Sequence, residues 1–292
     1  MNYPENDTLF RFLFEDVGVR GNLIHLDSSW RAILERHDYP ESVIPHLGEM
    51  TAASVMLSSI LKLDGSLIIQ AQGPGPVTAL VAQATNDRHF RALARWNHEP
   101  GEIESLADLT GNGHLALTID PMEGERYQGV VELKGENLSD AIEGYFEQSE
   151  QLKTMIRLVA DGDKAAGILI QVLPSEQGSE EDWRRISMLT ETVTDDELLN
   201  IEPTELIHRL YHEEDVRLFE PEPVAFRCSC SHEKVAQSLK ALGKSELDQI
   251  IEAEGAIETT CEFCNRTYRF DSVDVEQLFS DKPEISAPAA SQ

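Results

Sequence analysis

The sequence predicts an α+β protein with three parts: an N-terminal domain with a mixed or antiparallel sheet and flanking helices, a helical linker and a small C-terminal domain. Three observations support this class. Over residues 1–174, strand-like segments outnumber helical ones and do not alternate regularly with them. Residues 175–227 hold 15 acids and 5 bases around short amphipathic segments. All four cysteines lie in the last 65 of the 292 residues.

The N-terminal domain, residues 1–174, opens with an aromatic-rich strand at 9–14. Ser29 is the predicted N-cap of a helix that begins with Trp30, because apolar residues follow it at helical spacing. The motif Gly73-Pro-Gly-Pro76 predicts a turn between two strands, and Gly111-Asn-Gly113 predicts a hairpin turn. The other predicted elements are helices at 45–62 and 138–148 and strands at 65–71, 77–81, 114–119, 127–133, 153–159 and 167–173.

The linker, residues 175–227, contains two capping-box sequences, Ser179-Glu-Glu-Asp182 and Thr194-Asp-Asp-Glu197. Each predicts the start of a short helix, and prolines interrupt the rest of the segment. Isolated helices below about 12–15 residues are marginal in water. We therefore expect these acidic helices to fold only while they lie on an apolar surface of another domain.

The C-terminal domain, residues 228–280, is predicted to contain a helix capped by Ser231, a second helix opened by Ser245 and a hairpin at 259–270. Residues 281–292 have the composition of a disordered tail.

The net charge and the absence of a recognisable targeting signal argue against nucleic-acid-binding, membrane and secretory roles. The chain carries 53 acidic and 24 basic residues, a net charge of −29, so phosphate backbones and anionic lipids repel it. We therefore expect no nucleic-acid partner and no membrane association. The N-terminus has neither the basic nor the apolar region of a secretory signal, and no apolar run approaches the ~18 residues of a membrane span. A cytoplasmic location is expected.

The four cysteines form two close pairs with metal-ligand spacing. Cys228-Ser-Cys230 is followed by thirty residues and then by Cys261-Glu-Phe-Cys264. Two pairs separated by a long spacer are typical of a four-thiolate zinc site, and such a closed site leaves no open position for catalysis. The sequence therefore predicts a small zinc-binding domain that holds one Zn²⁺ per chain in the reduced form, and it predicts no catalytic residues and no enzyme.

The same pairs allow redox chemistry. Each pair is close enough in sequence to form a disulfide, Cys228–Cys230 or Cys261–Cys264, and this would eject the metal. Spacing alone leaves two interpretations open: an oxidation-sensitive switch and a permanently reduced structural zinc site.

The chain resembles the family of 33 kDa redox-regulated heat-shock chaperones. The resemblance rests on the cysteine spacing at the C-terminal end, on the length and acidity of the chain, and on Gly73-Pro-Gly-Pro76 and Tyr145-Phe-Glu-Gln-Ser-Glu-Gln151. It implies an ATP-independent holdase that is inactive when reduced and zinc-bound. It further implies that oxidation releases zinc, exposes apolar surface in the linker and favours a homodimer, and that the partners are unfolded client proteins.

Apolar linker residues are the predicted client-binding candidates, because they should be docked on the N-terminal domain until zinc leaves. They are Trp183, Ile186, Leu189, Leu206, Ile207 and Leu210.

Two other functions were weighed against this one. A constitutive zinc-ribbon interaction protein for nucleic acid would need a basic face, but residues 231–292 carry 12 acids and 6 bases. A thiol-disulfide oxidoreductase would place its C-x-x-C pair at a helix start, whereas here the pair is predicted to follow a strand.

Overall fold

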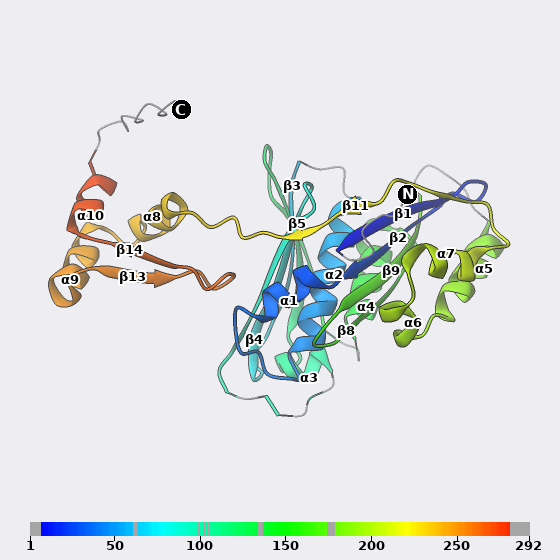
Figure 1. Cartoon of the computed structure of the whole chain (residues 1–292), viewed down its shortest axis with the longest axis horizontal. Helices are drawn as coiled ribbons and strands as arrows, with labels where there is room; N and C mark the ends of the chain where they lie inside the picture. Colours follow the sequence, from blue (N-terminus) through cyan, green and yellow to red (C-terminus); the bar gives the residue numbers. More distant parts are fainter. Residues whose placement is uncertain are drawn as a thin grey trace. The chain divides into compact units, whose positions relative to one another are not determined.

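The computed structural model describes residues 7–60, 64–98, 100–101, 103, 105–133, 137–173 and 179–280. The chain divides into two compact units, Met1–Arg227 and Cys228–Gln292 (Figure 1). The predicted linker therefore packs within the first unit, and all four cysteines belong to the second. The predicted tail at 281–292 lies outside the described residues.

Two sheets form the frame of the first unit. Sheet A has the order β10-β1-β2-β9-β8, with β11 also paired to β1, and all its pairings are antiparallel. Sheet B has the order β12-β5-β4-β3-β6-β7, antiparallel except for the pairing of β12 with β5. The strands of sheet A are β1 Thr8–Phe14, β2 Val19–Leu26, β8 Thr154–Ala160, β9 Ala165–Val172, β10 Val216–Leu218 and β11 Glu222–Pro223. Those of sheet B are β3 Gly65–Gln72, β4 Val77–Thr85, β5 His89–Trp96, β6 His114–Pro121, β7 Tyr127–Glu132 and β12 Ala225–Phe226.

Helix α2, Ile44–Ile60, lies between the two sheets and contacts strands of both (Figure 1). Most of its residues are buried, which explains why its apolar positions do not form a single stripe. At Gly48 an added Cβ would lie 2.3 Å from the Cβ of Ala160, so only glycine allows the helix to approach sheet A this closely. The main core therefore joins α2 to both sheets.

Shorter helices complete the first unit: α1 Ser28–Leu34, α3 Leu106–Thr110, α4 Leu138–Tyr145, the π-helix η1 Phe146–Glu150, α5 Glu180–Glu191, α6 Asp195–Asn200 and α7 Pro203–Tyr211. Both predicted capping boxes are present, at the starts of α5 and α6. Two predictions of detail are wrong. The N-cap of α1 is Asp27 rather than Ser29, and Gly111 is the left-handed C-cap of α3 rather than part of a hairpin turn.

An extended segment, residues 216–226, crosses from one sheet to the other and is called the strap here. Its strands β10 and β11 pair with β1 of sheet A, and β12 pairs with β5 of sheet B. The Glu222 carboxylate forms ion pairs with Arg11 of β1 and Arg88 beside β5. The strap therefore covers an edge strand in each sheet.

The second unit contains α8 His232–Lys240, α9 Lys244–Glu254, β13 Ile257–Thr260, β14 Thr267–Phe270 and α10 Ser272–Leu278. The N-cap of α9 is Gly243 rather than the predicted Ser245. With these elements the α+β class is confirmed. Among the described residues, no helix is both long and apolar enough to cross a bilayer.

Candidate metal centre

The four cysteines converge at one point in the second unit. Cys228 and Cys230 lie in the extended chain before α8, and Cys261 and Cys264 lie at the turn that joins β13 to β14. The four sulfur atoms all lie within 4.8 Å of one another. In particular, Cys228 Sγ is 3.7 Å from Cys261 Sγ, and Cys230 Sγ is 3.4 Å from Cys264 Sγ.

These separations fit a single soft metal ion. A tetrahedral site with metal–sulfur bonds of about 2.3 Å places its sulfurs about 3.8 Å apart. Four thiols at such distances, with no oxygen or imidazole ligand in the described cluster, could hold a metal ion of the kind that prefers thiolates. His232 lies next to this region but packs on the ring of Phe270, 4.2 Å between ring centroids.

The hairpin turn fixes the second cysteine pair through its own backbone. The Cys261 amide donates to the Arg266 carbonyl at 2.9 Å, and the Asn265 amide donates to the Cys261 carbonyl at 2.8 Å. Asn265 takes a left-handed φ of 57°, which asparagine tolerates well. The C-x-x-C pair therefore occupies a turn between strands, whereas a thioredoxin-type pair would occupy a helix start.

Tyr268 supports the cluster and is not among the site residues predicted from the sequence. Its hydroxyl donates a hydrogen bond to Cys230 Sγ at 3.0 Å, and its ring is buried in the small core of the unit. The alternation of Tyr268 with Phe270 along β14 was the available signal, because residues two apart share a face of a strand.

The thiols have different acidities. At Cys230 burial opposes ionisation, but hydrogen bonds from Tyr268 and the other three thiols outweigh it and lower its pKa to about 7. At Cys264 burial is the main cause that raises its pKa to about 12. Metal coordination requires thiolates, so an ion at this position would displace the protons of both residues.

The apolar core around the cluster is small. Its buried members are Leu247, Ile257, Tyr268, Phe270 and Val275, with Cys230 and Cys261 packed against them. A core of this size rarely stabilises an independent fold without a metal or a disulfide. The second unit is therefore expected to depend on its cysteine cluster for stability.

The predicted client-binding residues lie together on sheet A. Ile186, Leu206 and Ile207 are buried, and Trp183, Leu189 and Leu210 are partly buried against the same cluster. Their counterparts on β1 are Phe10, Phe12 and Phe14, which alternate along the predicted aromatic-rich strand and therefore share one of its faces. The docking predicted for the linker is therefore present in this structure.

Polar contacts add little to this docking. Lys153 pairs with Glu180 of α5, Arg157 pairs with Asp195 of α6 at 3.3 Å, and all four side chains are well exposed. Exposed ion pairs contribute about 0–1 kcal/mol. One buried hydrogen bond, 2.6 Å between the hydroxyls of Thr190 and Tyr211, joins α5 to α7. Apolar burial therefore provides most of the free energy that holds the linker on sheet A.

Comparisons with known proteins agree with this arrangement. The model of the family described as "Hsp33 protein" matches residues 7–271. A protein of Nitrosococcus oceani named 33 kDa chaperonin is 51% identical over 287 residues, covering 98% of both chains. A Shewanella loihica protein of the same name is 47% identical over 278 residues, covering 95% of this chain and 97% of the relative.

A solved structure shows the same fold. It is the crystal structure of a 33 kDa chaperonin (heat shock protein 33 homolog) from Thermotoga maritima, with a TM-score of 0.79 and 21% sequence identity. The match covers 93% of this chain and 97% of the other.

Proposed function

The chain belongs to the Hsp33 protein family, as the sequence motifs predicted, and from this premise we propose that it is a redox-regulated, ATP-independent chaperone. It would hold unfolded proteins and prevent their aggregation under oxidative stress. The observation that carries the proposal is the convergence of four thiols in a unit with a very small core. Such a unit is stable with its metal and unstable without it, which makes it a sensor of thiol oxidation.

In the reduced protein, Cys228, Cys230, Cys261 and Cys264 would together hold one Zn²⁺. Bound zinc would crosslink the unit through four cysteine ligands and would keep their sulfurs as thiolates. The thiolates are the groups that oxidants attack. The arrangement suits sensing rather than catalysis, because all four ligand positions are filled by the chain.

We expect one zinc ion and four titratable thiols per reduced chain. Metal analysis combined with a thiol-specific titrant measures both, and titration of all four thiols should release the whole of the metal. A metal content near zero, or a metal that stays bound after all thiols have reacted, would disprove the site.

Oxidation would convert each neighbouring pair of thiolates into a disulfide. With peroxide as the oxidant, each pair loses two electrons, one peroxide is reduced to two waters, and two protons are consumed. The disulfide sulfurs would be poor ligands for Zn²⁺, and the four cysteines would no longer hold it. The small core is then left without its crosslink, and the unit unfolds.

We expect the disulfides Cys228–Cys230 and Cys261–Cys264. In the folded unit all four sulfurs are near one another, so proximity there does not select the partners. As the unit begins to open during oxidation, the partner two or three residues away has the highest local concentration, because loop closure costs more for longer loops. Peptide mapping of the oxidised protein under non-reducing conditions checks this. A dominant bridge between Cys228 and Cys261 would contradict the proposed opening.

The release of the linker would then follow from the position of Cys228. Cys228 follows the end of β12 by two residues, so only Arg227 separates the strap from the first cysteine along the chain. Unfolding of the second unit would leave the short strands β12, β11 and β10 free to detach in turn. Residues 179–226 would leave both sheets and uncover the phenylalanines of β1, the apolar faces of α5 and α7, and the edges of β1 in sheet A and β5 in sheet B.

These surfaces suit unfolded clients, which offer exposed apolar side chains and extended backbone. Exposed apolar surface also favours a homodimer of the oxidised form, and the acidic chain would keep complexes soluble in the cytoplasm. The experiment that tests the function is an aggregation assay of a chemically unfolded client. Protein treated with peroxide under mildly unfolding conditions should suppress light scattering, and the same protein after reduction and zinc reloading should not.

A further inference from the structure

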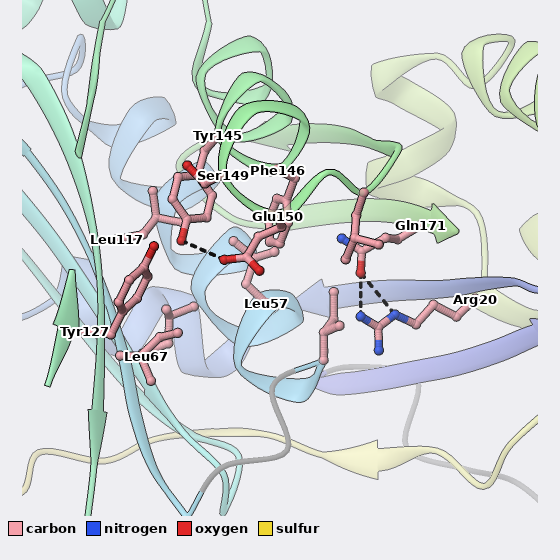
Figure 2. A pocket seen from close by; sticks show the side chains of 13 residues that line it. Arg20, Leu57, Leu67, Leu117, Tyr127, Tyr145, Phe146, Ser149, Glu150 and Gln171 are labelled. Carbon is pink, nitrogen blue, oxygen red and sulfur yellow. Dashed lines mark hydrogen bonds between the residues drawn. The ribbon is translucent and has the colours of Figure 1, made fainter. Parts of the chain in front are cut away.

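A cavity of about 490 Å³ lies in the first unit under the π-helix η1 (Figure 2). Its volume is in the range of small-molecule sites, about 300–1,000 Å³. One part of the wall is apolar and is formed by Leu57 of α2, Leu67 of β3 and Leu117 of β6. The cavity lining includes neither a cysteine nor any of the linker residues named above.

The polar part of the wall contains Arg20 of β2, which lies opposite Gln171 of β9 in the sheet register. The Arg20 guanidinium donates through Nε, at 3.2 Å, and through an Nη to the same oxygen, Gln171 Oε1. The Gln171 amide is itself fully buried and donates to Thr154 Oγ1 at 2.7 Å, which fixes its orientation. Arg20 is therefore held in place by a neutral group.

Among the described residues, no carboxylate lies within ion-pair distance of Arg20, in a chain with 53 acidic and 24 basic residues. Burial lowers the pKa of Arg20 to about 10, which reflects poor compensation of its charge. A guanidinium has five N–H donors, and one glutamine oxygen uses only two of them. The remaining donors suit the two oxygens of a carboxylate.

The opposite part of the wall comes from the end of α4, from η1 and from β7. The hydroxyl of Tyr145 donates to the Glu150 carboxylate at 3.3 Å, and Tyr127 faces Tyr145 (Figure 2). The π-helical turn ends at Gln151 with a left-handed φ of 54°, and π-helical turns occur often at functional sites. Because Glu150 is an acidic residue of the wall, it would repel a second negative charge on a bound ligand.

We propose that this cavity binds a small monocarboxylate with an apolar body. The carboxylate accepts hydrogen bonds from Arg20, and the apolar body lies against Leu57, Leu67 and Leu117. A dicarboxylate is disfavoured because its second charge would face Glu150. This site is independent of the metal and of the chaperone activity proposed above.

Octanoate is a suitable probe, and isothermal titration calorimetry of the reduced, zinc-loaded full chain measures its binding. We expect saturable binding of one octanoate per chain, with weaker binding of octanamide, octylamine and octanedioate. Arg20→Met keeps the apolar stem but removes the charged donors. It should weaken octanoate binding roughly ten- to a hundredfold, the range for hydrogen bonds to charged groups.

Arg91→Met is the matched control. Arg91 of β5 also donates to a glutamine across a strand pair, Gln83 Oε1 at 2.8 Å, but it does not line the cavity. Its replacement should leave octanoate affinity unchanged. Ser149→Trp tests the site without altering Arg20, because Ser149 is an exposed residue of the cavity wall and a large ring there should block entry.

Three results would overturn the proposal: no octanoate binding up to millimolar concentration, equal affinity for octanoate and octylamine, or unchanged affinity in both Arg20→Met and Ser149→Trp. Circular dichroism shows whether Arg20→Met folds. If it does not, the octanoate affinity of Ser149→Trp alone tests the site, and an unchanged affinity in that variant overturns the proposal.

Discussion

Replacement of both Leu206 and Ile207 by aspartate is expected to give a protein that suppresses client aggregation without any oxidant. The two side chains are 1% and 6% exposed against sheet A. Removal of each apolar side chain from a packed core costs about 2–5 kcal/mol of docking free energy. In the docked state the introduced carboxylates would also lose their hydration, which adds to this cost. The double variant therefore disfavours docking by more than about 4 kcal/mol, enough to reverse a marginal equilibrium. A light-scattering assay with reduced protein measures the effect.

A matched control is available on the exposed face of the same helix. Thr204 and His208 are exposed, so Thr204→Asp with His208→Asp adds the same two acidic groups without removing buried surface. This control should remain inactive until it is oxidised. If the Leu206/Ile207 variant is equally inactive while hydrogen exchange shows its α5–α7 region unprotected, undocking of the linker is not the activating event.

Cys261→Ser or Cys264→Ser is expected to abolish tight zinc binding and to unfold the second unit, while the first unit keeps its sheets. Structural zinc contributes about 10–16 kcal/mol to the folding of small zinc domains, which exceeds what a core of five buried residues can replace. The buried core around α2 contains none of the four cysteines, so its stability should not change in these variants. Hydrogen exchange followed by mass spectrometry separates the two units.

Ser229→Ala is the control for this pair, because Ser229 lies between Cys228 and Cys230 but is not a member of the ligand cluster. It should keep its metal and its amide protection. If a cysteine variant lost protection throughout β2, β9 and α2 as well, the two units would not be separable in stability.

The sequence was sufficient to predict that the four thiols lie together, because two close cysteine pairs with metal-ligand spacing are a local pattern. It was also sufficient for the linker helices, whose capping boxes and apolar spacing are local signals. Strands β2 and β5 were not predicted. β2 contains Gly21 and Asn22, and β5 is rich in alanine and arginine, so neither has the composition of a typical strand.

Long-range pairing explains the other omissions. The sequence of the strap predicts a loop, because Pro221 and Pro223 interrupt it. Its strands form only by pairing with β1 and β5, which are distant in the chain. The cavity is formed by residues from segments that are far apart in the chain, among them Arg20, Leu57, Leu117 and Gln171. No local pattern indicates such a wall. For Tyr268, alternation with Phe270 indicates a buried position on β14, but the hydrogen bond to Cys230 depends on a residue 38 positions away in the chain.

Loss of the metal in the second unit is expected to release residues 179–226 from sheets A and B of the first unit. Hydrogen exchange of the full chain, compared between the reduced zinc-loaded form and the peroxide-treated zinc-free form, tests it most directly. We expect the amides of α5, α6, α7 and the strap to lose protection together with the second unit, while those of β3, β4 and β6 remain protected. Full protection of α5–α7 in an oxidised sample that suppresses client aggregation would contradict it.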